Sequence, residues 1–434
     1  MRYVHATIEL INRVAKPHRI RLVSIVVIAA ATMLLLVSFA TSADRETVFG
    51  PQLGADYANF YIAGTILNSA DPSQLYDVRL QGELYHELLP QASHEEILLY
   101  PYAPFFAVFL RPFALLPYEW SYCAWLIVNL AAYAVGFLLV WKADPKLNDE
   151  SLSAALLIAL SFMPFILEGW IGGQSVGVII LVIGFAIFCQ SRRREALGGF
   201  ALAVCLFKPT ILVLIVPMLI VRRRYRALAG FFSGAAVMCG LSWLAVGGRG
   251  LTDYVRLMLV YAKVKSIAPE VFQTHKYVDL ASFMRLLTSN QTTLLPVVSA
   301  AVSVAVLSVL AYFWWTSDGK WSTMEKLAWA SALAWTPVLS PQCAIYDVTL
   351  LVPSTLLMFS ALSCYDPACV SQSKETLRSL VVLLYLISWI TQPVAVATGV
   401  QIITIAIIAI GVYALRIAWS SRSGIDPTKH GGRL

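Results

Sequence analysis

The chain contains 434 residues, of which 59% are hydrophobic and only 13% are charged, and its formal net charge is +7. About a quarter of the residues in a soluble globular domain are charged. The composition therefore excludes an ordinary soluble protein and predicts an all-α polytopic membrane protein, with a single membrane domain over residues 1–434. The basic residues stand in short clusters between apolar runs, which indicates membrane topology rather than a nucleic-acid-binding patch.

The first apolar run, residues 23–40, follows basic residues at positions 16, 19 and 21. A cleavable signal peptide is the alternative, because residues 38–43 are mostly small. The run is long for a signal peptide, which favours an uncleaved helix with a cytoplasmic N-terminus. Apolar stretches of spanning length are predicted at 22–41, 119–141, 151–168, 174–190, 226–246, 293–315, 325–340, 346–363, 377–392 and 396–418.

The polar segment 42–118 is predicted to be the first external loop. Its residues 42–100 carry nine acidic residues and two arginines, so the positive-inside rule places the segment outside the cytoplasm. Within it, 57–68 and 77–89 are expected to form short amphipathic helices in the plane of the membrane interface. Four prolines between 100 and 117 predict a packed, irregular segment instead of a clean span.

Asp56 is the first candidate for chemistry, since it stands among aromatic residues at the expected membrane level. The rings of Tyr57 and Tyr61 suit a membrane interface and can also stack on a sugar. A carboxylate in such surroundings is well placed to act as a general base. The alternative is a helix N-cap, because aspartate is a favoured cap and a helix is predicted to follow.

Residues 195–221 are too long for one untilted span and too short for two, and Lys208-Pro209 lies at their centre. Proline removes a backbone donor and disfavours helix at the preceding residue, so the segment should break there. An arginine triplet flanks each end, which predicts a re-entrant hairpin whose break lines a cavity. Counted as two helices, it brings the total to about twelve, with both termini cytoplasmic. Lys208, an unpaired cation in this apolar segment, is a candidate for phosphate binding, with a snorkelling lysine as the alternative.

Residues 247–292 are predicted to form a second external loop, yet they carry six basic residues against three acidic ones. Either the topology reverses at the hairpin or these charges have a function. A reversal would place an arginine triplet and the basic C-terminus outside. We therefore expect a cationic surface for the phosphate of an anionic lipid, with Arg256 and Lys265 as candidate contacts.

Polar residues also border two later spans. Gln174 follows a two-glycine turn, which by itself is an ordinary connection. Gln342, Tyr346 and Asp347 lie at a break near the outer face, where Asp347 either stabilises a helix dipole or faces the same cavity as Asp56. The six histidines and seven cysteines are dispersed, so no metal site and no cofactor are predicted.

Taken in chain order, several short motifs make the sequence resemble glycosyltransferase family 87, which comprises membrane enzymes of the GT-C fold. The resemblance covers about the first 230 residues well and the rest more thinly. The motifs are Asp56 to Tyr61, Leu75-Tyr76, Tyr100 to Pro104, Gly173-Gln174, Gly198-Gly199-Phe200 through Lys208-Pro209 to Pro217, and Ser340-Pro341 to Tyr346-Asp347.

The resemblance implies an inverting transferase that moves a mannose-like hexose or an arabinofuranose from a polyprenyl-phosphate donor to a lipid or glycan acceptor. The reaction would need no metal and would take place at the periplasmic face of the bacterial inner membrane. Asp56 matches the position of the family's catalytic base, and Lys208 would hold the donor phosphate. The residues then expected to contact substrate are Tyr57, Asn59, Tyr61, Tyr100, Gln174, His275, Gln342, Tyr346 and Asp347.

One departure from the family concerns histidine. Related mannosyltransferases carry histidine in the late external segment, where this chain has Gln342 and Cys343. His275, in the basic loop, is the candidate substitute. The donor sugar and the acceptor are therefore open at this point.

Two functions from other classes are also open. A transporter or flippase predicts two related halves with paired broken helices, whereas one broken hairpin is found. An O-antigen ligase or polymerase predicts a main catalytic loop late in the chain. Membrane lipids are expected partners and nucleic acids are not, and the sequence leaves the oligomeric state open.

Overall fold

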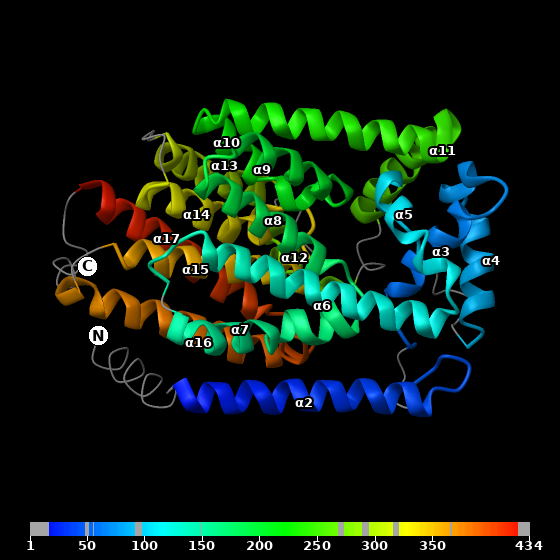
Figure 1. The fold of residues 1–434 in the computed structure, drawn as a ribbon, viewed down its shortest axis with the longest axis horizontal. Helices are drawn as coiled ribbons and strands as arrows, with labels where there is room; N and C mark the ends of the chain where they lie inside the picture. Colours follow the sequence, from blue (N-terminus) through cyan, green and yellow to red (C-terminus); the bar gives the residue numbers. More distant parts are fainter. Residues whose placement is uncertain are drawn as a thin grey trace.

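The computed structural model describes residues 17–47, 52–54, 56–91, 98–147, 149–267, 273–288, 295–315, 321–364 and 367–423. In these ranges the fold is all-helical, and strand-like pairing is limited to isolated bridges. Most long helices run along the longest axis of the molecule (Figure 1). They are α2 (Pro17–Thr41), α6 (Tyr118–Lys142), α7 (Asp149–Leu160), α8 (Val176–Ser191), α11 (Tyr225–Ile267), α13 (Leu295–Trp314), α14 (Thr323–Leu339), α15 (Leu351–Leu362), α16 (Pro367–Thr398) and α17 (Ile402–Ser423).

Among the described residues, seven helices are long and apolar enough to cross a membrane, or eight if one bent pair forms a single span. That pair consists of α7 and the π-helix η3 (Pro164–Ile171), which are bent by 54°. Large apolar side chains such as Leu36, Trp243 and Leu244 face outward, as a lipid-facing surface requires. The chain is therefore a multi-pass membrane protein, while the total of about twelve spans stays a prediction.

The helices lie close to where hydropathy predicts spans, but several boundaries differ. The predicted break at 393–395 does not occur, since α16 continues through Pro393 to Thr398. The chain turns instead at Gly399, whose φ of 70° lies in the left-handed region that glycine tolerates.

Helices α6 and α8 pack closely because glycine removes the side chain at their contacts. A Cβ atom added to Gly184 would lie 2.2 Å from the carbonyl oxygen of Gly136. One added to Gly177 would lie 1.9 Å from the carbonyl oxygen of Asn129. Small residues are common where membrane helices approach closely, and here they fix the position of α8 and of the turn before it.

A cap of short helices covers one end of the bundle (Figure 1). It contains α3 (Tyr57–Leu67), η1 (Pro72–Tyr76), α4 (Val78–Leu88), α5 (Pro104–Leu110) and η2 (Phe113–Leu115). The prediction of a surface amphipathic helix is wrong for α3, because nine of its residues are buried. Helix α4 does present a polar outer face, and the proline-rich segment is short and irregular as expected.

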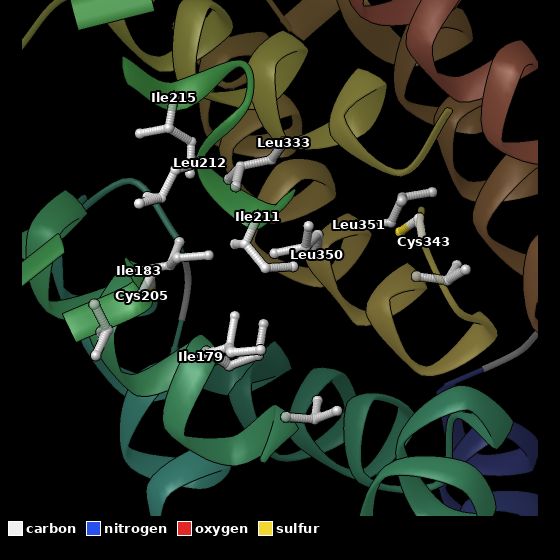
Figure 2. Close-up of a cluster of buried hydrophobic side chains, with 14 of the residues drawn as sticks. Ile179, Ile183, Cys205, Ile211, Leu212, Ile215, Leu333, Cys343, Leu350 and Leu351 are labelled. Carbon is white, nitrogen blue, oxygen red and sulfur yellow. The ribbon is translucent and has the colours of Figure 1, made fainter. Parts of the chain in front are cut away.

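The segment 195–221 is broken at Lys208, as predicted. Helix α9 (Glu195–Leu202) and η4 (Ala203–Phe207) precede it, and η5 (Pro209–Leu212) and α10 (Ile215–Val221) follow. The backbone at Lys208 has φ −133° and ψ 76°, which is not helical. Both ends of the segment meet, since Arg224 contacts Glu195 at 3.4 Å and also pairs with Glu325. The tip packs into an apolar core with α8, α14 and η8 (Ile345–Leu350) (Figure 2).

The predicted basic loop 247–292 is largely helical. Helix α11 runs through position 247, where Gly247 (φ 65°) makes a kink, and it ends only at Ile267. The short helices η7 (Thr274–Lys276) and α12 (Leu280–Thr288) follow. Residues 268–272 and 289–294 lie outside the described residues, as does the side chain of Lys265.

Candidate active site

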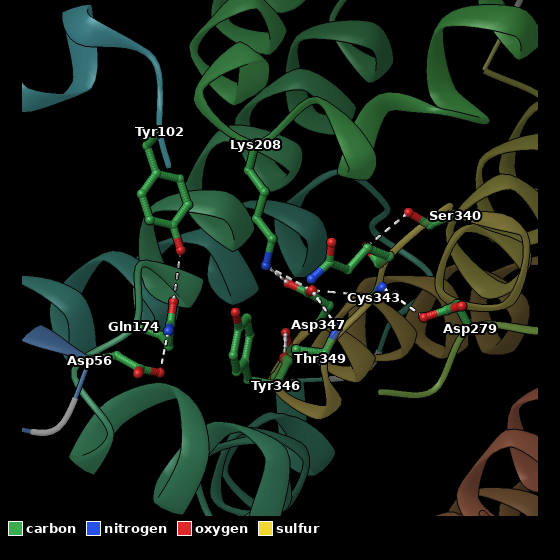
Figure 3. A network of polar contacts seen from close by, with 12 residues as sticks. Asp56, Tyr102, Gln174, Lys208, Asp279, Ser340, Cys343, Tyr346, Asp347 and Thr349 are labelled. Carbon is green, nitrogen blue, oxygen red and sulfur yellow. Dashed lines mark hydrogen bonds and ion pairs between the residues drawn. The ribbon is translucent and has the colours of Figure 1, made fainter. Parts of the chain in front are cut away.

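Asp56 directly precedes α3 but does not cap it. Its backbone is helical, and its side chain makes no hydrogen bond to the first turn of the helix. Instead, the side-chain amide of Gln174 donates a hydrogen bond to Oδ2 of Asp56 (Figure 3). The N-cap explanation is therefore wrong, and the half-buried carboxylate points into the interior of the bundle.

Gln174 is itself held from two sides. The Tyr102 hydroxyl donates to its Oε1 at 3.4 Å, and Nδ2 of Asn129 donates to its backbone carbonyl at 2.6 Å. Oδ1 of Asn129 accepts from the backbone N–H of Gly177 at 2.6 Å, which ties the arrangement to the start of α8. A carboxylate accepts hydrogen bonds and an amide nitrogen donates them. The contacts of Tyr102 and Asn129 therefore hold Gln174 with its side-chain nitrogen directed at Asp56.

Burial raises the pKa of the Asp56 carboxyl above its ordinary value. The hydrogen bond from Gln174 and the charges of Lys276 and Lys208 act in the opposite direction and lower this pKa. Desolvation disfavours the charged form, whereas donors and cations favour it. The result is a carboxylate more basic than an exposed aspartate, with two cations near enough to act on its charge.

Lys208 is paired, which corrects the prediction of an unpaired cation. Its Nζ lies 2.6 and 2.7 Å from the two carboxylate oxygens of Asp347, and 4.3 Å from the centre of the Tyr346 ring. Asp347 is buried, and it also accepts from the backbone N–H of Ala344 at 3.2 Å, so it both supports the start of η8 and holds the lysine. An ammonium group has three donors, so one is left for a ligand.

These groups come from distant parts of the chain and surround one space (Figure 3). Asp56 lies on one side of it, the Lys208–Asp347 pair on the other, and Tyr346 between them. Gln342 forms hydrogen bonds with Tyr261 and Tyr277, which connects α11 and the segment after it to the same region. Burial raises the pKa of Tyr102, and so do the negative charges of Asp56 and Asp347, so its hydroxyl stays protonated and can donate.

Three of the predicted contact residues form hydrogen bonds within the protein. The Tyr57 hydroxyl lies 2.5 Å from that of Ser121. Tyr61 donates to the carbonyl of Leu116 at 3.0 Å, and the fully buried Tyr100 donates to that of Ala103 at 3.3 Å. The Tyr57 contact joins the cap to α6, and substrate contact by these three residues stays a prediction.

Three other predicted residues have these surroundings. Arg256 is exposed on α11 and pairs with Asp253 on the same helix at 3.2 Å. His275 contributes its backbone carbonyl, which accepts from Gln401 at 2.5 Å. Asn59 is buried, and its Oδ1 has no hydrogen-bond partner in the described structure.

Three residues of the site were missed as candidates from the sequence. Tyr102 lies in the quoted proline-rich motif, and Lys276 was counted only as a loop charge. Asn129 carried a usable signal, because a polar residue in the middle of an apolar span needs an internal partner. Among the described residues, no three side chains of His, Cys, Asp or Glu are grouped as metal ligands.

Comparison with known proteins gives one match. The family model described as glycosyltransferase family 87 matches residues 100–341, which is more than half of the chain. The match includes Gln174 and Lys208 and ends before Asp347. No curated protein and no solved structure matches the chain.

Proposed function

The chain belongs to glycosyltransferase family 87, and from this we propose that it is an inverting enzyme that uses a polyprenyl-phosphate sugar as donor. The sugar is a mannose-like hexose or an arabinofuranose, and the acceptor is a hydroxyl of a lipid or glycan. The observation that carries this proposal is the juxtaposition of a hydrogen-bonded Asp56 and a cationic Lys208 around one space.

Asp56 acts as the general base. It accepts the proton of the acceptor hydroxyl while the hydroxyl oxygen attacks the anomeric carbon of the donor. The bond between that carbon and the phosphate oxygen breaks, and its electron pair leaves with the polyprenyl phosphate. Attack from the face opposite the leaving group inverts the anomeric configuration. The burial that raises the pKa of Asp56 supports this role because it makes the carboxylate a stronger base.

Lys208 stabilises the leaving phosphate. As the donor bond breaks, negative charge develops on the phosphate oxygen, and a fixed cation offsets it. Both carboxylate oxygens of Asp347 accept hydrogen bonds from the ammonium group of Lys208, which fixes the position of that group. Lys276, whose charge also acts on Asp56, is a second candidate for the donor phosphate.

The site faces the periplasm in this proposal. The acidic segment 42–118 forms the cap beside Asp56, whereas the arginine triplets lie at the ends of the hairpin 195–221, away from its tip. By the positive-inside rule the cap end is external and both termini are cytoplasmic, in a bacterial inner membrane. The segment 247–292 then contributes Lys276 from the external side.

The test is transfer by purified protein in nanodiscs, supplied with synthetic polyprenyl-phosphate mannose or arabinofuranose and bacterial membrane lipids. Wild type should release polyprenyl phosphate and transfer label to an acceptor. Asp56→Asn should lose at least about 100-fold of this rate, with its melting temperature unchanged. Asp253→Asn, which alters a surface carboxylate, is the matched control.

Three outcomes would contradict the proposal. Full transfer by Asp56→Asn would remove Asp56 as the base. Retention of the anomeric configuration in the product would exclude single displacement. Movement of the intact donor across the bilayer without sugar transfer would favour a flippase.

A further inference from the structure

A second cavity lies at the other end of the bundle from the cap. Its volume is about 650 Å³, and residues of α2, α6, α7, α15 and α16 line it. Its wall includes Arg21 near the start of α2 and Trp141 at the end of α6, whereas α3 to α5 lie at the opposite end of the long axis (Figure 1). The cavity is therefore separate from the site around Asp56.

The cavity has an apolar interior and a basic rim. The inner wall is formed by side chains such as Phe137, Phe162 and Leu356. Four cationic residues, Arg21, Lys146, Lys374 and Arg378, belong to the lining, and no acidic residue does among the side chains that the structure describes. Arg21 and Lys146 lie near the start of α2 and the end of α6, and Lys374 and Arg378 lie in the first half of α16. The charges therefore gather on the side where a lipid headgroup would lie.

Trp141 contributes an aromatic ring to this wall. The residue is only 5% exposed, and its indole N–H has no hydrogen-bond acceptor in the described structure. The nitrogen is covered by neighbouring protein atoms, so Trp141 contributes its ring and not its N–H to the cavity wall. Tryptophan is favoured at the depth where lipid headgroups meet acyl chains.

We propose that this cavity binds one anionic glycerophospholipid. Its phosphate lies at the rim formed by Arg21, Lys146, Lys374 and Arg378, and an acyl chain fills the interior. Four lining cations favour a net negative headgroup over a zwitterionic one, whose ammonium group they would repel. The polyprenyl donor is not the occupant, since its proposed site is at the other end of the molecule.

The test uses quenching of Trp141 fluorescence by phospholipids with brominated acyl chains. The fluorescence of the Trp141→Phe variant is subtracted from that of wild type, which leaves the signal of Trp141. Brominated phosphatidylglycerol should quench this signal at a low mole fraction, and brominated phosphatidylcholine should not. The variant Lys374→Gln/Arg378→Gln should bind phosphatidylglycerol about 30-fold more weakly, since each surface cation contributes roughly a fivefold factor. Native mass spectrometry should show one retained phosphatidylglycerol on wild type and less on this variant.

The matched control is Arg223→Gln/Arg226→Gln, which removes two exposed cations elsewhere on the surface. It should bind like wild type. Equal quenching by both headgroups, or equal weakening by the control, would overturn the proposal. Displacement of the brominated lipid by polyprenyl phosphate but not by phosphatidylglycerol would overturn the assigned lipid class. None of these readouts depends on sugar transfer, so the proposed function can fail separately.

Discussion

Replacing Gln174 tests whether the contact with Asp56 matters for catalysis. Gln174→Leu keeps a side chain of similar size but removes the amide that donates to the carboxylate. A hydrogen bond to a charged group contributes about 1.5–3 kcal/mol. If Gln174 orients the base, kcat/KM at neutral pH should fall between about 10- and 150-fold, since each 1.4 kcal/mol is a factor of ten. The KM for the donor should change little.

The pH profile separates positioning from a general structural defect. Transfer needs deprotonated Asp56, so the rate should fall as pH decreases through the pKa of this group. Burial raises that pKa, and the bond from Gln174 lowers it. Removing the bond therefore raises the pKa further, and the acidic limb of the kcat/KM profile should move to higher pH in Gln174→Leu.

The assay is steady-state release of polyprenyl phosphate from pH 4 to 9, measured for wild type, Gln174→Leu and Gln190→Leu. Gln190 is the matched control, because it donates at 3.2 Å to Glu325 in a separate ionic cluster. Its substitution should leave the acidic limb in place. An unshifted limb in Gln174→Leu, or a loss that is the same at every pH, would refute a role for Gln174 in holding the base.

Two further substitutions test the structure around the site. Lys208→Met should lower the free energy of unfolding by about 3–5 kcal/mol, because it leaves Asp347 buried without its cation. The double variant Lys208→Met/Asp347→Leu should recover the melting temperature but not the transfer activity. Recovered transfer would exclude Lys208 as a phosphate contact. Gly184→Leu should abolish the folded peak in detergent size-exclusion chromatography, since a Cβ atom there meets the Gly136 carbonyl. Gly240→Leu, which meets no atom within 4 Å, should elute normally, and equal behaviour of the two would contradict the close-packing argument.

Local properties of the sequence were sufficient for the membrane class, the positions of the helices and the break at Lys208. Hydropathy over about twenty residues reports whether a segment suits a bilayer, and proline disturbs helix wherever it occurs. Asp56 was also selected from a local pattern, a carboxylate among aromatic residues, and its role as the base stays a prediction. The motif order indicated the glycosyltransferase family, which the family match over residues 100–341 confirms.

The partners of these residues depended on tertiary packing. Lys208 and Asp347 are 139 positions apart, and Asp56 and Gln174 are 118 apart, so no local pattern pairs them. Helix α3 carries no charged residue and is buried, and the aromatic side chains of α6 pack against it. The sequence by itself determined which segments enter the membrane and which groups can carry charge there. Only the folded bundle decided which charges meet, because long-range contacts follow from helix packing and not from spacing along the chain.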